Sequence, residues 1–131
     1  SVLCIWDKLD QKEQPAWQHF ASAGFFAAFA VMHALADFPL QGDYIAKQKT
    51  RRHADSLSVW IIALSAHSVI HAGGVWLVTG SLAFGFAELA LHALIDICKG
   101  EGKFGLVADQ LLHLSCKLAY ALLLGYGVIH A

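Results

Sequence analysis

The chain has 131 residues, of which 57% are hydrophobic and 15% charged, and its formal net charge is −1. Soluble domains are about 45–50% apolar and about 25% charged, so the composition argues against an ordinary soluble domain, and the small net charge excludes a general polyanion binder. Three cysteines, Cys4, Cys98 and Cys116, form neither a CxxC pair nor a disulfide framework, so we expect them to be packing residues.

Residues 1–15 form a polar, charged segment without a continuous apolar core, so we expect no secretory signal peptide there. Residues 16–131 hold four apolar stretches, and a helix that spans a bilayer needs about 20 such residues. Pro15 and Pro39 bound the first stretch, and a short link around Gly80 joins the second and third into an antiparallel hairpin. The predicted fold is an all-α integral membrane bundle of about four transmembrane helices, at residues 16–38, 57–79, 82–98 and 107–131. The alternative, a soluble bundle with a very apolar core, would need an outward polar face that these stretches hardly offer.

Basic residues are distributed unevenly over the links between the predicted spans. On one side of the membrane the links carry six basic residues, namely Lys47, Lys49, Arg51, Arg52, Lys99 and Lys103. The opposite side has only Lys8 and Lys12. The positive-inside rule places the side with six basic residues in the cytoplasm. We therefore expect a multi-pass protein of the bacterial inner membrane, with both termini outward and the lipid bilayer as its partner.

Ionisable residues inside the predicted spans recur at steps of four. The four sets are His33 and Asp37, then His67 and His71, then Glu88, His92 and Asp96, and finally Asp109, His113 and Lys117. Four residues turn a helix by about 400°, so each set forms a polar stripe on one helix face. A charged side chain at mid-bilayer costs about 3 kcal/mol. The stripes are therefore expected to face one another, near the cytoplasmic side.

Depth along each helix groups these residues into layers. At about 1.5 Å per residue, Asp37, Asp96 and Asp109 lie in the first turn from the cytoplasmic ends, and His33, His92 and His113 lie one turn deeper. Antiparallel helices must reverse the sequence order of such pairs. The order is indeed His-x3-Asp in the first and third spans and Asp-x3-His in the fourth.

Three histidines at one depth suit a zinc-like ion with an open coordination position, and carboxylates complete or orient such a site or hold a second ion. The predicted ligands are His33, Asp37, His67, His92, Asp96, Asp109 and His113. Glu88 is the predicted general base, with an aspartate such as Asp37 as the alternative. Lys99 follows Asp96 by three residues and could pair with it or bind phosphate. Two other interpretations stay open, namely a hydrogen-bonded core that joins helices and a pathway for ions or protons in a homo-oligomer.

Four sequence motifs carry a resemblance to a known family. They read HALADFPLQGDYIAKQK at residues 33–49, AH…IH at 66–71, ELALHALIDICK at 88–99 and ADQLLHL at 108–114. With these motifs the chain resembles a family of small bacterial and phage membrane proteins, domain of unknown function thirty-three-oh-seven. The family pattern maps onto His33, Asp37, Phe38, Gln41, Lys47, His67, His92, Asp96, Lys99, Asp109, Gln110 and His113.

The resemblance implies a helical membrane fold but no established reaction. It adds Gln41, Lys47 and Gln110 as predicted substrate-binding residues and Lys99 as a site residue, with Glu88 and Asp37 the other predicted catalytic residues. The pattern is also similar, more loosely, to membrane-bound metal-dependent hydrolases. Two functions are therefore expected: a zinc-dependent hydrolase that cleaves an ester, phosphoester or amide bond at the cytoplasmic leaflet, or a non-enzymatic subunit for ion or proton conduction or for interaction. Nucleic acid is not an expected partner.

Overall fold

The computed structural model describes residues 17–127, so the polar segment 1–15 and the last residues of the fourth predicted span lie outside it. The described part contains helices and no strand, which confirms the predicted all-α class. The helices are α2 (Trp17–Asp37), α3 (Gly42–Gln48), α4 (Leu57–Thr79), α5 (Leu82–Gly100) and α6 (Leu106–Gly125).

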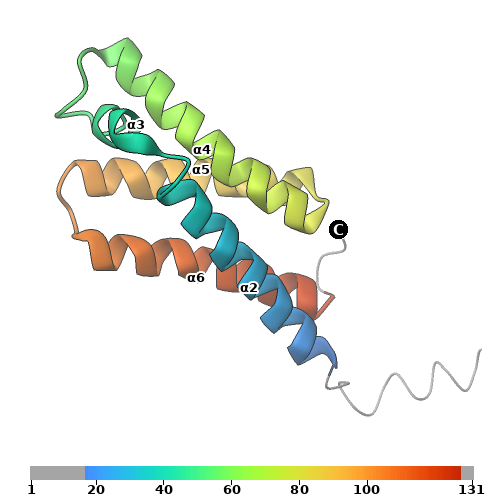
Figure 1. Ribbon diagram of the computed structural model, residues 1–131. Coiled ribbons are helices and arrows are strands. Elements are labelled where there is room, and N and C mark those ends of the chain that lie inside the picture. The colour runs from blue at the N-terminus through green and yellow to red at the C-terminus, as the bar shows by residue number, and fades with distance from the viewer. Residues whose placement is uncertain (1–16, 128–131) are drawn as a thin grey trace, which may run out of the picture.

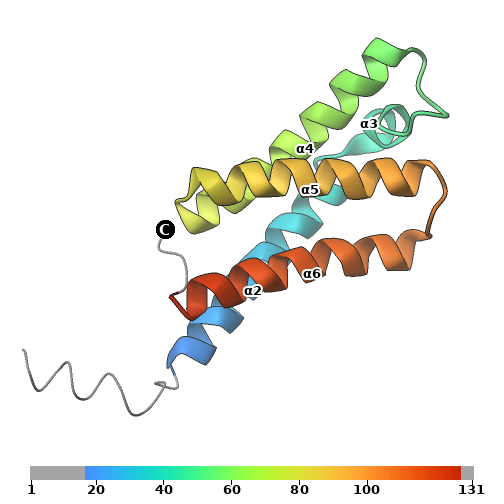
Figure 2. The ribbon, with the colours of Figure 1, turned by 180° about the vertical axis from the view of Figure 1, so that it is seen from behind.

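The four long helices form a bundle in which α2 and α5 each pack against both α4 and α6 (Figures 1 and 2). The α4–α5 hairpin turns at Gly80, which has a φ of 71° and donates its N–H to the carbonyl of Trp76 at 2.7 Å. A left-handed φ of this kind favours glycine. The short α3 and the α5–α6 link lie together at one end of the bundle, on the left in Figure 1, and we call this the loop end.

Within residues 17–127, three helices are long and apolar enough to cross a membrane, at Phe20–Asp37, Leu57–Thr79 and Leu106–Gly125. They indicate a membrane protein and support three of the four predicted spans. Helix α5 is not among them, and it carries three charged residues, Glu88, Asp96 and Lys99. The third predicted span, at residues 82–98, therefore stays a prediction.

The distribution of side chains is the reverse of that in a soluble protein. Large apolar side chains cover the outside, as shown by Leu77 at 76% exposed and Phe86 at 67%, whereas Glu88 at 1% and Lys117 at 2% are buried. Lipid accepts an apolar surface, and charged groups in a membrane protein turn toward the bundle interior. This distribution agrees with the membrane assignment.

Helix α3 is held against the start of α4 by a small polar network. The amide of Gln48 donates to Asp55 Oδ2 at 2.7 Å and accepts from the backbone N–H of Asp55 at 2.8 Å. Trp60 Nε1 donates to the carbonyl oxygen of Lys49 at 3.1 Å. These bonds fix the rotation of α3, and this rotation decides which of its lysines turns into the bundle.

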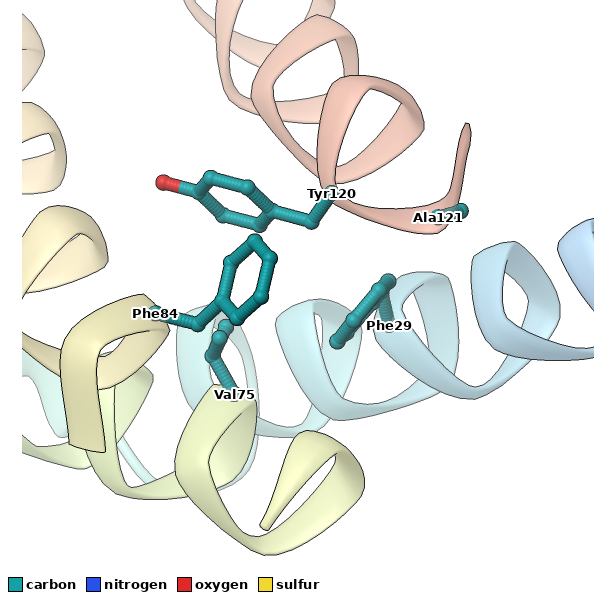
Figure 3. Packing of buried hydrophobic residues seen from close by; sticks show 5 residues of the cluster. All are labelled: Phe29, Val75, Phe84, Tyr120 and Ala121. Atoms are coloured by element: carbon teal, nitrogen blue, oxygen red, sulfur yellow. The ribbon is translucent and has the colours of Figure 1, made fainter. Parts of the chain in front are cut away.

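The end of the bundle away from the loop end is filled by an apolar cluster, to which all four long helices contribute (Figure 3). The ring of Tyr120 stands edge-on to those of Phe29 and Phe84, at centroid distances of 6.1 and 5.5 Å. Beyond this cluster, a Cβ on Gly125 would lie 1.8 Å from Ser22 Oγ, so α2 and α6 approach as closely as small residues allow.

Candidate functional site

The four polar stripes meet inside the bundle on the loop-end side of the apolar cluster. Every histidine of the stripes is at most 4% exposed, and the side chain of Asp37 is 11% exposed. The other aspartates, Asp96 and Asp109, are 5% and 1% exposed. The residues brought together are His33, Asp37, His67, His71, His92, Asp96, Asp109 and His113.

His92 is the centre of the imidazole cluster. Its ring centroid lies 3.7 Å from that of His71, 4.2 Å from that of His113 and 5.0 Å from that of His67. The ring of His33 lies farther away, with centroid distances of 6.1 Å to His92 and 5.1 Å to His113. His71 thus lies nearer to His92 than the predicted ligand His33 does, and the three-histidine set of His33, His92 and His113 stays a prediction.

His33 is held back by polar partners on α2 and α6. Its Nε2 lies 3.2 Å from Gln110 Oε1 and 3.2 Å from Asp37 Oδ2. Gln110 in turn donates to Asp37 at 3.0 Å and to Asp109 at 3.2 Å. Gln110 thus links three residues of the cluster and orients the carboxylate of Asp37.

In the part of the chain that the structure describes, two groups of side chains could each hold a metal ion, because the ligand atoms of each group lie within 4.8 Å of one another. The first group is Asp37, His67, His71 and His92, and we call it the four-ligand group. The second group, His92, Asp96 and His113, shares His92 with the first. Asp37 Oδ1 is already close to two of its neighbours, at 2.9 Å from His71 Nε2 and 3.4 Å from His67 Nε2.

Several buried ring nitrogens make no hydrogen bond, and this bears on whether the cluster fits a metal ion. Nε2 of His92 makes no hydrogen bond, and Nδ1 of His67 and His113 has no partner either, although all three atoms are buried. Burial of a polar atom without a partner costs free energy, so native proteins rarely leave such atoms unsatisfied. A bound cation would satisfy the imidazole lone pairs, and the donor set fits one.

A lysine enters the cluster, but it is Lys49 and not the predicted Lys47. Lys49 Nζ lies 3.0 Å from His67 Nε2 and 2.9 Å from Asp96 Oδ2. The side chain of Lys47 is 58% exposed and pairs with Asp55 at 3.2 Å. Residues two apart on a helix point to nearly opposite sides, so the rotation of α3 that brings Lys49 inward turns Lys47 outward.

Glu88 lies on the far side of the cluster from the loop end. It pairs with Lys117, and its Oε1 lies 3.3 Å from His92 Nδ1. A carboxylate that contacts one nitrogen of an imidazole orients the ring and leaves the other nitrogen for a metal. This placement suits an orienting role for Glu88, and its role as general base stays a prediction.

An ion pair closes the loop-end side of the cluster. Lys99 Nζ donates to Asp109 Oδ2 at 2.7 Å, and Asp109 Oδ1 lies 3.4 Å from His113 Nε2. Asp96 Oδ1 lies at the same distance, 3.4 Å, from that nitrogen. Asp109 is therefore placed to orient His113, in the way that Glu88 is placed to orient His92.

A pocket of about 410 Å³ leads from the loop end to the cluster. Asp37 and Asp96 form part of its lining, together with the predicted residues Gln41, Lys99 and Gln110. The remaining lining residues are Phe38, Ala46, Lys49, Thr50, Arg52, His53, Gly100, Gly102 and Leu106. Glu88 and Lys47 do not line it. The pocket gives a polar molecule from outside a route to the carboxylates of both metal-binding groups.

Sequence reasoning left three residues out of the site. For His71 the signal was present, because it follows His67 by four residues on the same helix face. Lys117 also belongs to a stripe, but its partner Glu88 is on another helix, and spacing within one helix does not reveal that pair. Lys49 had no distinguishing signal, because the sequence does not show how α3 is rotated.

Comparison with known proteins agrees with the resemblance seen in the motifs. Residues 25–128 match the model of a family described as "Protein of unknown function (DUF3307)". No curated protein matches the chain, and no solved structure does. The matched residues include every helix of the cluster and more than three quarters of the chain, and the chain therefore belongs to the DUF3307 family.

Proposed function

We propose that this chain is a membrane-embedded, metal-dependent hydrolase. It would act at the cytoplasmic leaflet of a bacterial inner membrane. The observation that carries the proposal is His92, a fully buried imidazole whose Nδ1 faces Glu88 at 3.3 Å and whose Nε2 makes no hydrogen bond. It is surrounded by Asp37, His67 and His71, whose ligand atoms lie close enough to share one ion with it.

The donor set favours zinc. Three imidazoles and one carboxylate match the nitrogen and oxygen donors that zinc accepts, and a catalytic zinc site would use three of these four ligands and keep the fourth position for water. When bound, such an ion supplies Lewis acidity and lowers the pKa of a water molecule. The residues around it hold the geometry, with Glu88 orienting His92, and Lys117 neutralising the buried charge of Glu88.

Other residues line the pocket that a substrate would enter. Asp96 lines the pocket and lies 3.4 Å from His113 Nε2, so this pair is positioned to accept a proton from water. Gln41 and Gln110 offer amide groups, and Lys99 offers a positive charge. This arrangement suits hydrolysis of an ester, phosphoester or amide bond.

A second function is an ion- or proton-conducting subunit, for which chains of buried ionisable residues are typical. The apolar cluster argues against conduction through a single chain. Tyr120 follows Lys117 by one helical turn, and Phe84 precedes Glu88 by one turn, so apolar rings adjoin the deepest ion pair. A pathway through one chain would have to cross this cluster, whereas the pocket opens at the loop end.

Metal content and hydrolysis test the proposal together. The parent protein, purified in detergent, should hold about one zinc ion or more per chain by elemental analysis. His71→Ala should lose most of the metal, and the control Asp43→Ala should keep it, because Asp43 is exposed, lies outside both metal-binding groups and does not line the pocket. Chromogenic phosphate, carboxylate and amide substrates should be cleaved by the parent and the control only.

The two readouts separate the parts of the proposal. A parent protein that holds no transition metal, even after reconstitution with zinc, would refute the metal centre and leave the conduction hypothesis ahead. Bound zinc without cleavage of any of the three substrate types would keep the metal centre and argue against the hydrolase.

A further inference from the structure

The wall of the pocket carries positive charge from three separate segments. Lys49 follows α3, Arg52 lies in the loop before α4, and Lys99 lies in the last turn of α5. The first turn of α6 adjoins the same space through Leu106, and its N-cap residue, Gly105, has no side chain to satisfy the free N–H groups. Three cations and a helix start converge on one pocket.

Arg52 is the cation whose charge is least neutralised. Its Nη2 donates to the carbonyl oxygen of Glu101 at 2.6 Å, which is a neutral acceptor. Among residues 17–127 it forms no ion pair with a carboxylate, whereas Lys49 pairs with Asp96 and Lys99 with Asp109. The guanidinium therefore retains both charge and donors for a ligand.

The charges of the pocket balance only in the absence of a metal. The three cations Lys49, Arg52 and Lys99 face Asp37, Asp96 and the buried Asp109, so the local formal charge is near zero. A divalent ion in the four-ligand group would bring it to about +2. A doubly charged anion would then restore neutrality.

We propose that this pocket binds the phosphate group of a phosphate monoester, which is the substrate of the hydrolase. The inference rests on the proposed function, because the metal supplies the excess positive charge. Arg52 donates from its planar fork, which matches phosphate oxygens, and Lys99 and the amides of Gln41 and Gln110 supply further donors. Hydrolysis breaks the bond between phosphorus and the ester oxygen, and a new bond forms from phosphorus to the oxygen of water. The alcohol leaves with one water proton, and inorganic phosphate remains.

The position and size of the pocket indicate which alcohol parts of a phosphate monoester it could accept. A volume of 410 Å³ corresponds to about a dozen water molecules, so a phosphate group would leave room for part of the alcohol. Phe38 and Leu106 line the pocket and are 72% and 63% exposed, so its rim is partly apolar. A lipid headgroup and a soluble phosphate monoester share the chemistry that this pocket recognises.

The test measures binding of inorganic phosphate to the zinc-loaded protein by calorimetry, after free metal has been removed. The variant is Arg52→Gln, and the matched control is Arg51→Gln, because Arg51 does not line the pocket and stacks over Trp60 at 5.8 Å. Both changes remove one positive charge. We expect phosphate to bind about tenfold more weakly to Arg52→Gln, and within about twofold of the parent to Arg51→Gln. Zinc content should be the same in all three proteins.

Two further arms identify the source of the phosphate group. Phosphatidic acid in phosphatidylcholine vesicles should release phosphate in the presence of the reconstituted parent if the substrate is a lipid, and glycerol 3-phosphate should do so if it is soluble. A zinc-loaded parent that binds no inorganic phosphate would overturn the inference and leave the metal centre standing. Equal weakening in both arginine variants would also overturn it, because the effect would then be one of net charge alone. A parent that binds no zinc would end the proposed function and this inference together.

Discussion

The replacement of His92 by alanine separates a metal centre from a hydrogen-bonded core. His92 belongs to both groups of possible ligands, and its side chain is fully buried. If it is a ligand, His92→Ala should lower metal affinity by about 100-fold or more, since even residues that only orient ligands cost about 10- to 100-fold. If it is merely part of a polar core, the change should leave any response to a chelator unaltered.

The size of the effect follows from mass action. With free zinc at about 100 times the dissociation constant of the parent, bound metal stabilises the fold by about 2.7 kcal/mol. In His92→Ala the same zinc concentration would be near the new dissociation constant, and the stabilisation falls to about 0.4 kcal/mol. Loss of packing around the missing ring affects the variant with and without metal alike, so the difference between the two conditions isolates the metal.

The assay is thermal unfolding in detergent micelles, with and without a chelator, followed by tryptophan fluorescence. The chelator should lower the melting temperature of the parent and of the control Asp43→Ala clearly, and that of His92→Ala only slightly. If the zinc-reconstituted parent melts at the same temperature in both conditions, the metal centre is refuted. If parent and His92→Ala respond equally, a metal is bound but His92 is not its ligand.

The remaining predictions address topology, the deep ion pair and helix packing. A membrane-impermeant thiol reagent applied outside intact cells should label a cysteine at Gly80 and not one at Thr50, and the reverse result would invert the orientation. Lys117→Met leaves the buried carboxylate of Glu88 unpaired and should lower the free energy of unfolding by about 3–5 kcal/mol. A decrease below about 1 kcal/mol, measured by thermal or denaturant unfolding, would argue against this ion pair. Gly125→Ala should destabilise the contact of α2 with α6, because the new Cβ has no room. The control Gly24→Ala should not, because nothing lies within 4 Å of its Cβ. Equal melting temperatures of the two variants would contradict the close packing.

The polar stripes were readable from the sequence because an α-helix has a fixed period. Steps of four residues place His33 over Asp37 and His67 over His71 on one face, whatever the rest of the chain does. The high energy of a charge in lipid then sends every such face inward. These two facts predicted the all-α class and the residues of the interior without any knowledge of how the helices pack.

Which residues touch across the bundle was decided only by the tertiary structure. His33 and His71 are equally good ligands by spacing, but the network of Gln110 and Asp37 draws His33 away from His92, whereas His71 stacks on it at 3.7 Å. Depth estimates along separate helices fix heights to within a turn but not the rotation of one helix against another. Contacts of about 3 Å between helices depend on that rotation.

Lys47 and Lys49 also show that the sequence does not determine how a helix is rotated. Both are basic residues at one end of the short α3, and nothing in their spacing distinguishes an inward lysine from an outward one. The bonds of Gln48 with Asp55 and of Trp60 with the Lys49 carbonyl set the rotation of the helix, and these partners lie beyond its end. The sequence by itself determined the period of the helices and the inward direction of their charges, because both follow from local geometry and the energy of burial. Packing between helices decided which lysine reaches the histidines, because a rotation of α3 by half a turn exchanges the two.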